Sequence, residues 1–183
     1  VSSHTAIDLP SLSPPDSVET LDFETILAAM VADYQILQPD WDATVESDPV
    51  LKVLEVCAQR EVVLRQQAND RVKAVLLAFA SGTDLDHYAA GFGVERQIVT
   101  PADDSTSPPT PAVYESDARL RQRTQLALEG FTTAGPVGAY VFHAMSASPT
   151  VKDVDVSSPT PGVVLVVVLS TEGDGVPDAQ LIN

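Results

Sequence analysis

The stretch from Asp48 to Ala80 constrains the fold of this chain more than any other feature. After Pro49 the chain contains no proline or glycine until Gly82. Asp48 suits the N-cap position of a helix, and proline is favoured at the first helical position, where an N–H group has no partner anyway. The pattern predicts one continuous helix over about 48–80, about 50 Å long at 1.5 Å per residue. Such a helix is too long for one small domain to surround, so we expect it to belong to a helical bundle.

Apolar residues recur along this predicted helix at a near-heptad spacing, which is typical of helices that pack against other helices. The positions that we assign to an assembly interface are Leu54, Cys57, Leu64, Val72, Val75 and Phe79. A second apolar line passes through Val56, Val63 and Leu77 and indicates more than one packing partner. Part of this surface should be exposed in the isolated chain or covered by another chain, because a small domain cannot bury all of it.

The residues before the long helix are predicted to form an extended arm and a first helix. The segment IDLPSLSPPDSVET is rich in proline and has no apolar periodicity, so we assign residues 1–20 to an extended acidic arm. From Phe23 to Leu37 apolar residues recur at three- and four-residue steps, which predicts a helix with Asp22 as its cap. Residues 21–99 are therefore interpreted as a helical region.

Acidic residues dominate the charge of the chain. There are 26 Asp and Glu residues against 10 Lys and Arg residues, which gives a net charge of -16. A field of this sign repels nucleic acid and anionic membranes and favours basic protein partners or divalent cations. Residues 1–47 contain no Lys or Arg. This region is either a solvated acidic surface or an acidic arm that docks on a basic neighbour. No run of apolar residues reaches the length of a membrane-spanning helix.

The segment GTDLDHYAAGFGVERQ contains a Gly-x-Gly pair followed by an arginine. Thr83 and Asp86 have the spacing of a helix cap, and apolar residues follow at helical intervals. Gly91 and Gly93 then fall at the end of a short helix, where glycine relieves a left-handed conformation. A phosphate-binding loop places its glycines between a strand and the start of a helix. We therefore predict a helix stop and no nucleotide site.

The second half of the sequence predicts a small domain of mixed structure. Residues 100–115 are rich in proline and are predicted as a linker or surface loop. Ser116 should cap a helix whose polar flank contains Arg119, Arg121 and Arg123; these arginines either face solvent or bind an anion. A helix starting at Pro136 and two strands, TVKDVDV and GVVLVVVL, follow.

We therefore expect residues 116–183 to form a small α+β domain in which the two strands pair as a β-hairpin packed on helices, and the class of the whole chain is α+β. The sequence stops at AQLIN, just after Pro177 and Asp178 signal a further helix, so we expect a domain truncated at its C-terminus. GVVLVVVL is too apolar to face water, and one face of this strand should lack its cover.

No arrangement of residues predicts catalysis, a metal centre or a bound cofactor. The histidines His4, His87 and His143 are scattered, and we interpret His143 as a hydrogen-bonded core residue. Cys57 lies on the apolar path of the long helix, where free cysteine acts as a small hydrophobic residue. The loop TEGDGVPD offers Glu172, Asp174 and Asp178, the oxygen ligands that calcium prefers. Its spacing does not match an EF-hand, which favours an ordinary turn.

Several of these stretches also resemble a known family. They are AIDLPSL, LDFETILA, LKVLEVCAQREVVLRQQANDRVKAVLLAFASGTDLDHYAAGFGVER, ESDARLRQRTQLALEGFTTAGPVGAYVFHAMSA and VKDVDVSSPTPGVVLVVVLSTEGDG. In this order, and over nearly the whole chain, they look like the baseplate assembly protein J family of contractile-tailed bacteriophages. The motif regions of that family fall at Ala80 to Arg96 and at Thr133 to Ala144.

The resemblance implies a structural subunit of the baseplate wedge, without enzymatic activity. It implies pairing with a second copy and with other wedge subunits, partly through bundles of long helices, and bridging of neighbouring wedges into a ring around the tail hub. It further implies a place in the virion after synthesis in the host cytoplasm, and a family sequence that continues beyond this chain. The acidic region leaves an alternative open: an acidic adaptor or inhibitor that binds a basic partner.

Overall fold

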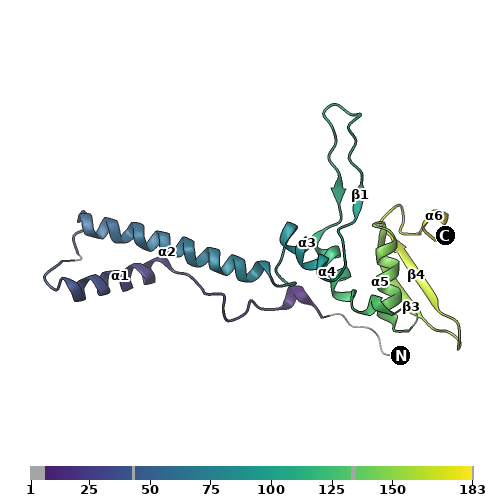
Figure 1. Cartoon of the computed structure of the whole chain (residues 1–183), viewed down its shortest axis with the longest axis horizontal. Coiled ribbons are helices and arrows are strands. Elements are labelled where there is room, and N and C mark those ends of the chain that lie inside the picture. The colour runs from purple at the N-terminus through teal and green to yellow at the C-terminus, as the bar shows by residue number, and fades with distance from the viewer. Residues whose placement is uncertain (1–6, 43, 133–134, 183) are drawn as a thin grey trace. The chain divides into compact units, whose positions relative to one another are not determined.

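The computed structural model describes residues 7–42, 44–132 and 135–182, and it confirms the α+β class. The chain divides into two compact units. We call Ser13–Leu76 the hairpin unit, and residues 7–12 with 77–182 the body unit (Figure 1). The described elements are η1 (Leu9–Ser11), α1 (Phe23–Leu37), α2 (Pro49–Ala74), α3 (Gly82–Ala90), β1 (Ile98–Thr100), β2 (Val113–Tyr114), α4 (Asp117–Leu126), η2 (Glu129–Phe131), α5 (Val137–Ala147), β3 (Val151–Ser157), β4 (Leu165–Ser170) and α6 (Ala179–Ile182).

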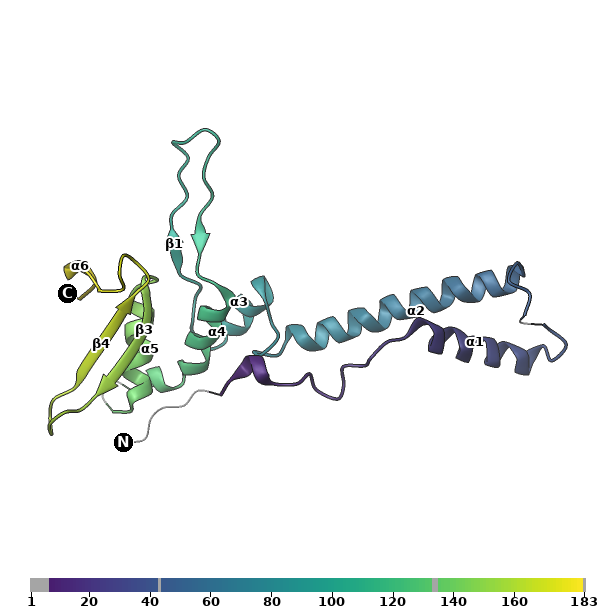
Figure 2. The ribbon, with the colours of Figure 1, turned by 180° about the vertical axis from the view of Figure 1, so that it is seen from behind.

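The hairpin unit consists of α1 and α2 lying side by side (Figures 1 and 2). Both predicted caps are confirmed: the Asp22 carboxylate accepts from the Thr25 N–H, and the Asp48 carboxylate accepts from the N–H groups of Val50 and Leu51. Within α2 only Ala58 and Asn69 are buried among the described residues, and none is buried in α1. Two helices alone cannot enclose a core, so most of their apolar surface stays accessible.

The N-terminal segment is tied to α2 by polar contacts. The Glu19 N–H donates to Asn69 Oδ1 at 3.0 Å, and Asn69 Nδ2 donates to the Glu19 carbonyl at 2.9 Å. Arg65 also forms an ion pair of 3.2 Å with the Glu19 carboxylate. Residues 1–6 of the expected extended arm, and with them His4, lie outside the described residues.

Helix α2 begins at Pro49 as expected but ends at Ala74, so the expectation of a helix reaching Ala80 is wrong. Turns follow, and in them Leu77 packs against a buried cluster of the body unit. The Arg121 guanidinium donates to the carbonyl oxygens of Leu77 and Ala80, both at 2.7 Å. These contacts give partners to carbonyl groups of the turns that follow the helix.

The first core of the body unit lies between α3 and α4. Leu85 and Leu120 are fully buried there, together with Ala80, Ala89, Val94 and Ala127. Helix α3 begins at Gly82 with Ser81 as its cap residue, so the expected Thr83 cap is wrong. The Gly82 N–H donates instead to the Asp117 carboxylate on α4, at 3.0 Å. The glycine stop is confirmed: α3 ends at Ala90, and Gly93 adopts a φ of 73°.

Strands β1 and β2 form a projecting hairpin where the sequence predicts a linker or loop (Figures 1 and 2). They are antiparallel and pair Ile98 with Tyr114 and Thr100 with Val113. Farther out, Asp103 pairs with Thr110. The linker interpretation is wrong, because α3 and α4 on either side of the hairpin share one core.

The second core lies between α5 and the antiparallel hairpin of β3 and β4, as expected. It contains Leu126, Met145, Val151, Val154 and Val156. Strand β3 alternates exposed and buried residues from Asp153 onward, after a register shift, whereas most of β4 is exposed. In the part of the chain that the structure describes, β4 lacks cover as expected, but it does face water, so the expectation that this strand is too apolar to do so is wrong.

The two compact units do not follow the expected domain boundaries at 99 and 116. The division falls after Leu76, because α3 packs with α4 in the body unit and not with α1 and α2.

Candidate assembly surfaces

Helix α2 has an exposed apolar face, which we call the outer stripe. It consists of Val53, Val56, Cys57, Val63 and Leu64, at helical spacing. Val56 and Leu64 are each 63% exposed. Arg60 and Arg71 are exposed on the same face and form no ion pair within the described residues. An apolar helix face that its own chain leaves uncovered is typical of a protein–protein contact.

The six predicted interface residues do not lie on one surface. Cys57 and Leu64 belong to the outer stripe, whereas Leu54 is half-buried on the side of α2 that faces α1. Val72 is half-buried, and Val75 and Phe79 lie beyond the end of the helix. The set divides because, at about 100° per residue, Leu54 lies about 60° from Cys57 and about 80° from Leu64 around the helix, on the side of the buried Ala58. Val56 and Val63, noted in the sequence as a second line, are on the outer stripe.

The surface around α1 is acidic. Between Ser13 and Leu51 the chain has no Lys or Arg and has these carboxylates: Asp16, Glu19, Asp22, Glu24, Asp33, Asp40, Asp42, Glu46 and Asp48. The Thr25 hydroxyl and N–H lower the pKa of Asp22, and Thr44 does the same for Asp42. These groups are therefore ionised at neutral pH and suit a basic neighbour.

The arginines of α4 are internal cross-links, so neither the solvated flank nor the anion site expected for them is correct. Arg119 donates to the carbonyl oxygens of Met145 at 2.7 Å and of Ser148 at 2.8 Å, and also to that of Val151. Arg121 binds the turns after α2, as described above. Arg123 donates to the Glu95 carbonyl at 3.1 Å. Together they hold α5, β3 and the segments around α3 against α4.

The carboxylate of Glu115 pairs with two of these arginines. Its side chain is 0% exposed and forms ion pairs with Arg123 and, at 3.1 Å, with Arg119 Nε, although the latter contact lacks hydrogen-bond alignment. Burial lowers the pKa of Arg119. Arg96 lies nearby: burial lowers its pKa, but its hydrogen bonds to Asp86 and Asp117 outweigh this, and the net shift is upward. The sequence offered no signal for these partners.

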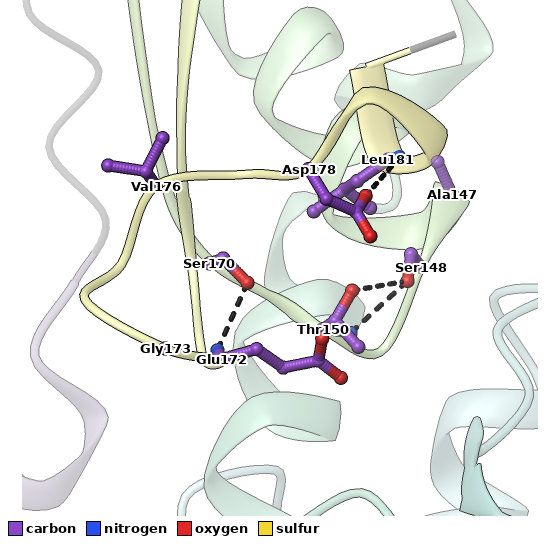
Figure 3. A pocket seen from close by; sticks show the side chains of 9 residues that line it. All are labelled: Ala147, Ser148, Thr150, Ser170, Glu172, Gly173, Val176, Asp178 and Leu181. Carbon is purple, nitrogen blue, oxygen red and sulfur yellow. Dashed lines mark hydrogen bonds between the residues drawn. The ribbon is translucent and has the colours of Figure 1, made fainter.

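A cavity of about 730 Å³ lies beside the C-terminal end of α5 (Figure 3). Its lining includes the hydroxyls of Ser148, Thr150 and Ser170 and the side chains of Glu172 and Asp178. Asp178 Oδ1 accepts from the Leu181 N–H at 2.8 Å, and Asp174 Oδ1 accepts from the Val176 N–H at 3.2 Å. These carboxylates therefore act in turns, the interpretation that the sequence favoured. No metal-binding group of His, Cys, Asp or Glu is found among the described residues.

The remaining candidate residues lie apart from one another. His87 is in the last turn of α3, and Cys57 is exposed on α2. His143 is exposed on α5, so its assignment to the core is wrong; it lies edge-on to Phe142, with ring centroids 5.5 Å apart. Its neighbours Gly138, Ala139 and Met145 occupy the buried face of α5 instead. In the described part of the chain no helix is long and apolar enough to span a membrane.

Large parts of the chain are similar in sequence to known proteins. The family model of the Baseplate J-like N-terminal domain matches residues 46–103, and that of the Baseplate J-like central domain matches residues 132–183. The chain is also 48% identical, over 183 residues, to baseplate protein J of Escherichia phage P2. That match covers 96% of this chain and 61% of the relative, so the chain spans less than two thirds of the relative's length. The chain belongs to the baseplate J family.

Proposed function

We propose that this chain is a structural subunit of a contractile-tail baseplate, in which it builds the wedge and links wedges around the tail hub. The outer stripe of α2 is the observation that supports this function most directly. It exposes apolar side chains along several turns of a helix that its own chain covers on the opposite face only. The relative's name, baseplate protein J, places that protein in a baseplate.

The proposed partners at the outer stripe are a second copy of the chain and other wedge subunits. Apolar residues at helical spacing pack against another helix by fitting between its side chains. Arg60 and Arg71 lie on the same face without ion pairs in the described structure, and α1 is acidic. An approaching helix that carries acidic residues would pair with Arg60 and Arg71. Helix α1 of a second copy is such a helix. The chain has no enzymatic role in this proposal.

Replacing Leu64 by Asp tests the proposal. The side chain is 63% exposed, so the substitution leaves the fold of the chain intact while it places a charge in the stripe. We expect the variant to lose most of its co-purification with co-expressed wedge subunits. Gln35→Asp is the control for an added carboxylate, because Gln35 is exposed on α1 and not on the helix that carries the stripe. Unchanged stoichiometry of the Leu64→Asp complex would reject the stripe as an assembly surface.

The acidic surface also suits the alternative function, an acidic adaptor that binds a basic partner. The same co-purification experiment tests this alternative. Binding through exposed charges weakens strongly as salt rises, whereas apolar helix packing changes little. Co-purification at about 0.05 M and about 0.5 M NaCl separates the two functions, since the Debye length shrinks severalfold over this range. Complexes that survive the higher concentration support the baseplate subunit; complexes that dissociate support the adaptor.

A further inference from the structure

Residues 98–114, which we call the arm, project from the body unit and belong to neither of its buried clusters (Figures 1 and 2). Outside the β1–β2 pairs, Asp103 and Thr110 exchange two backbone hydrogen bonds of 2.9 Å. The Ser105 N–H and hydroxyl donate to the Asp103 carboxylate and close the tip. A two-stranded hairpin on its own is marginally stable in water, so the arm needs support at its base.

That support comes from buried and half-buried polar groups of the body unit. Arg96, two residues before β1, forms ion pairs with Asp86 at 2.6 Å and Asp117 at 2.7 Å, and donates to the Glu115 carbonyl at 2.8 Å. Gln97 donates to the Ser146 carbonyl at 2.7 Å. Glu115, directly after β2, is held by the arginines of α4. The body unit thus fixes the position of an element that adds nothing to its cores.

The root of the arm is apolar on both faces. Ile98, Val99, Val113 and Tyr114 are between 44% and 53% exposed. Ile98 and Val99 are consecutive in a strand, so their side chains point to opposite faces of the ribbon. An anchored ribbon that exposes apolar side chains on both faces is suited to insertion between two walls of a partner.

Charge decides which kind of partner fits. Within residues 98–114 the charged side chains are Asp103 and Asp104, and there is no Lys or Arg. A second copy has a net charge of -16 and repels an acidic arm, whereas a surface with Lys or Arg attracts it. Pro101, Pro108, Pro109 and Pro111 lack N–H donors, which disfavours the addition of a partner strand along the outer arm.

We propose that the arm inserts into an apolar cleft with a basic rim on a different baseplate subunit. The inference rests on the proposed function, because it takes the partner from the same assembly. The apolar root fills the cleft and supplies most of the affinity. The aspartates near the tip meet the basic rim and set the rate and the salt dependence of binding.

The test measures binding of the purified chain to each of the other baseplate subunits, purified singly. Val99→Asp introduces a charge at the root, and Val99→Thr is the control that keeps a β-branched side chain without charge. We expect Val99→Asp to weaken binding to one subunit by about tenfold or more, as at a central contact residue, and Val99→Thr by much less. Asp104→Lys should weaken the same complex by about threefold at low salt and less at high salt.

The outcomes separate this inference from the proposed function. If Leu64→Asp disrupts assembly while all arm variants bind like the unmodified chain, the arm proposal is wrong and the proposed function stands. If Asp104→Lys strengthens an association between two copies of the chain, the occupant is a second copy and the proposal is overturned. Loss of binding by Val99→Asp to one subunit, with Val99→Thr retained, supports it. Circular dichroism of each variant verifies the fold.

Discussion

At the scale of single residues, Glu115 is the buried anion of the body unit. Its carboxylate is withdrawn from water and lies between Arg119 and Arg123. These arginines also bind backbone carbonyls of Met145, Ser148 and Glu95. The negative charge of Glu115 therefore compensates the buried positive charges of Arg119 and Arg123, which join α4 to the rest of the unit. Breaking such a pair from one side leaves an uncompensated buried charge, which is the more destabilising kind of change.

We predict that Glu115→Gln lowers the free energy of unfolding by about 3 kcal/mol, because Arg119 and Arg123 lose their buried anion. Urea denaturation followed by circular dichroism measures the effect. Glu95→Gln is the control, since Glu95 is exposed and the change removes the same charge; it should shift stability by less than about 0.5 kcal/mol. Equal urea midpoints for Glu115→Gln and Glu95→Gln would show that the buried ion pairs of Glu115 add nothing to stability.

At the scale of elements, a hydrogen bond joins the first residue of α3 to the first residue of α4. The first N–H of α3, that of Gly82, is satisfied by the Asp117 carboxylate in the first turn of α4. The same carboxylate binds Arg96 at the base of the arm. Three elements thus meet at one side chain. The hydrogen bond from Gly82 lowers the pKa of Asp117, and Arg96 lowers it further.

The sign of this shift gives a pH prediction for Asp117→Asn. Because the folded pKa lies below the unfolded one, about 3.9 for Asp, ionised Asp117 stabilises the fold fully above that value. This contribution is lost as the pH falls through the lowered pKa. Thermal melts should therefore show the variant less stable than the unmodified chain at pH 7, with a gap that narrows below about pH 4. A gap that stays constant down to pH 3 would contradict the assignment.

At the scale of the whole molecule, a net charge of -16 coexists with uncovered apolar surfaces. Repulsion between copies opposes association, but β4 contains no charged residue. Its outward side chains Leu165, Val167 and Leu169 pair across the sheet with Ser157, Asp155 and Asp153. An uncharged, exposed strand has none of the features that prevent edge-to-edge pairing. We therefore expect the chain to self-associate through its C-terminal part.

Val167→Lys tests this association, because it places a cation in the middle of the exposed apolar face. Sedimentation velocity at matched concentrations should show a larger monomer fraction for the variant. The Leu64→Asp background removes any contribution from the outer stripe. Ser157→Lys, exposed on β3 of the same sheet, is the control for added charge. An identical size distribution for Val167→Lys and the control would exclude β4 as the contact.

Features that depend on near neighbours in the chain could be predicted from the residues alone. Asp22, Asp48 and Ser116 each cap a helix through N–H groups two or three residues away, so their roles were readable. The alternation of β3 and the uncharged run of β4 predicted their hairpin for the same reason. The ordered motifs identified the family, because a motif is a property of the chain and needs no coordinates.

The tertiary structure alone decided the features that depend on distant partners. The turns after the end of α2 at Ala74 are held by Arg121, which is 44 residues beyond Leu77 and donates a hydrogen bond to the Leu77 carbonyl. The proline-rich segment is a hairpin because Arg96 and Glu115 anchor its two ends. The three arginines of α4 have the spacing of a solvated helix flank, yet they bind groups inside the body unit. His143 lies in an apolar helix, yet it is exposed. In both cases the packing of the folded chain decides which side chains are buried. A local sequence pattern indicates whether a side chain favours burial or solvent. Whether it is buried depends on which distant segments pack against it in the folded chain.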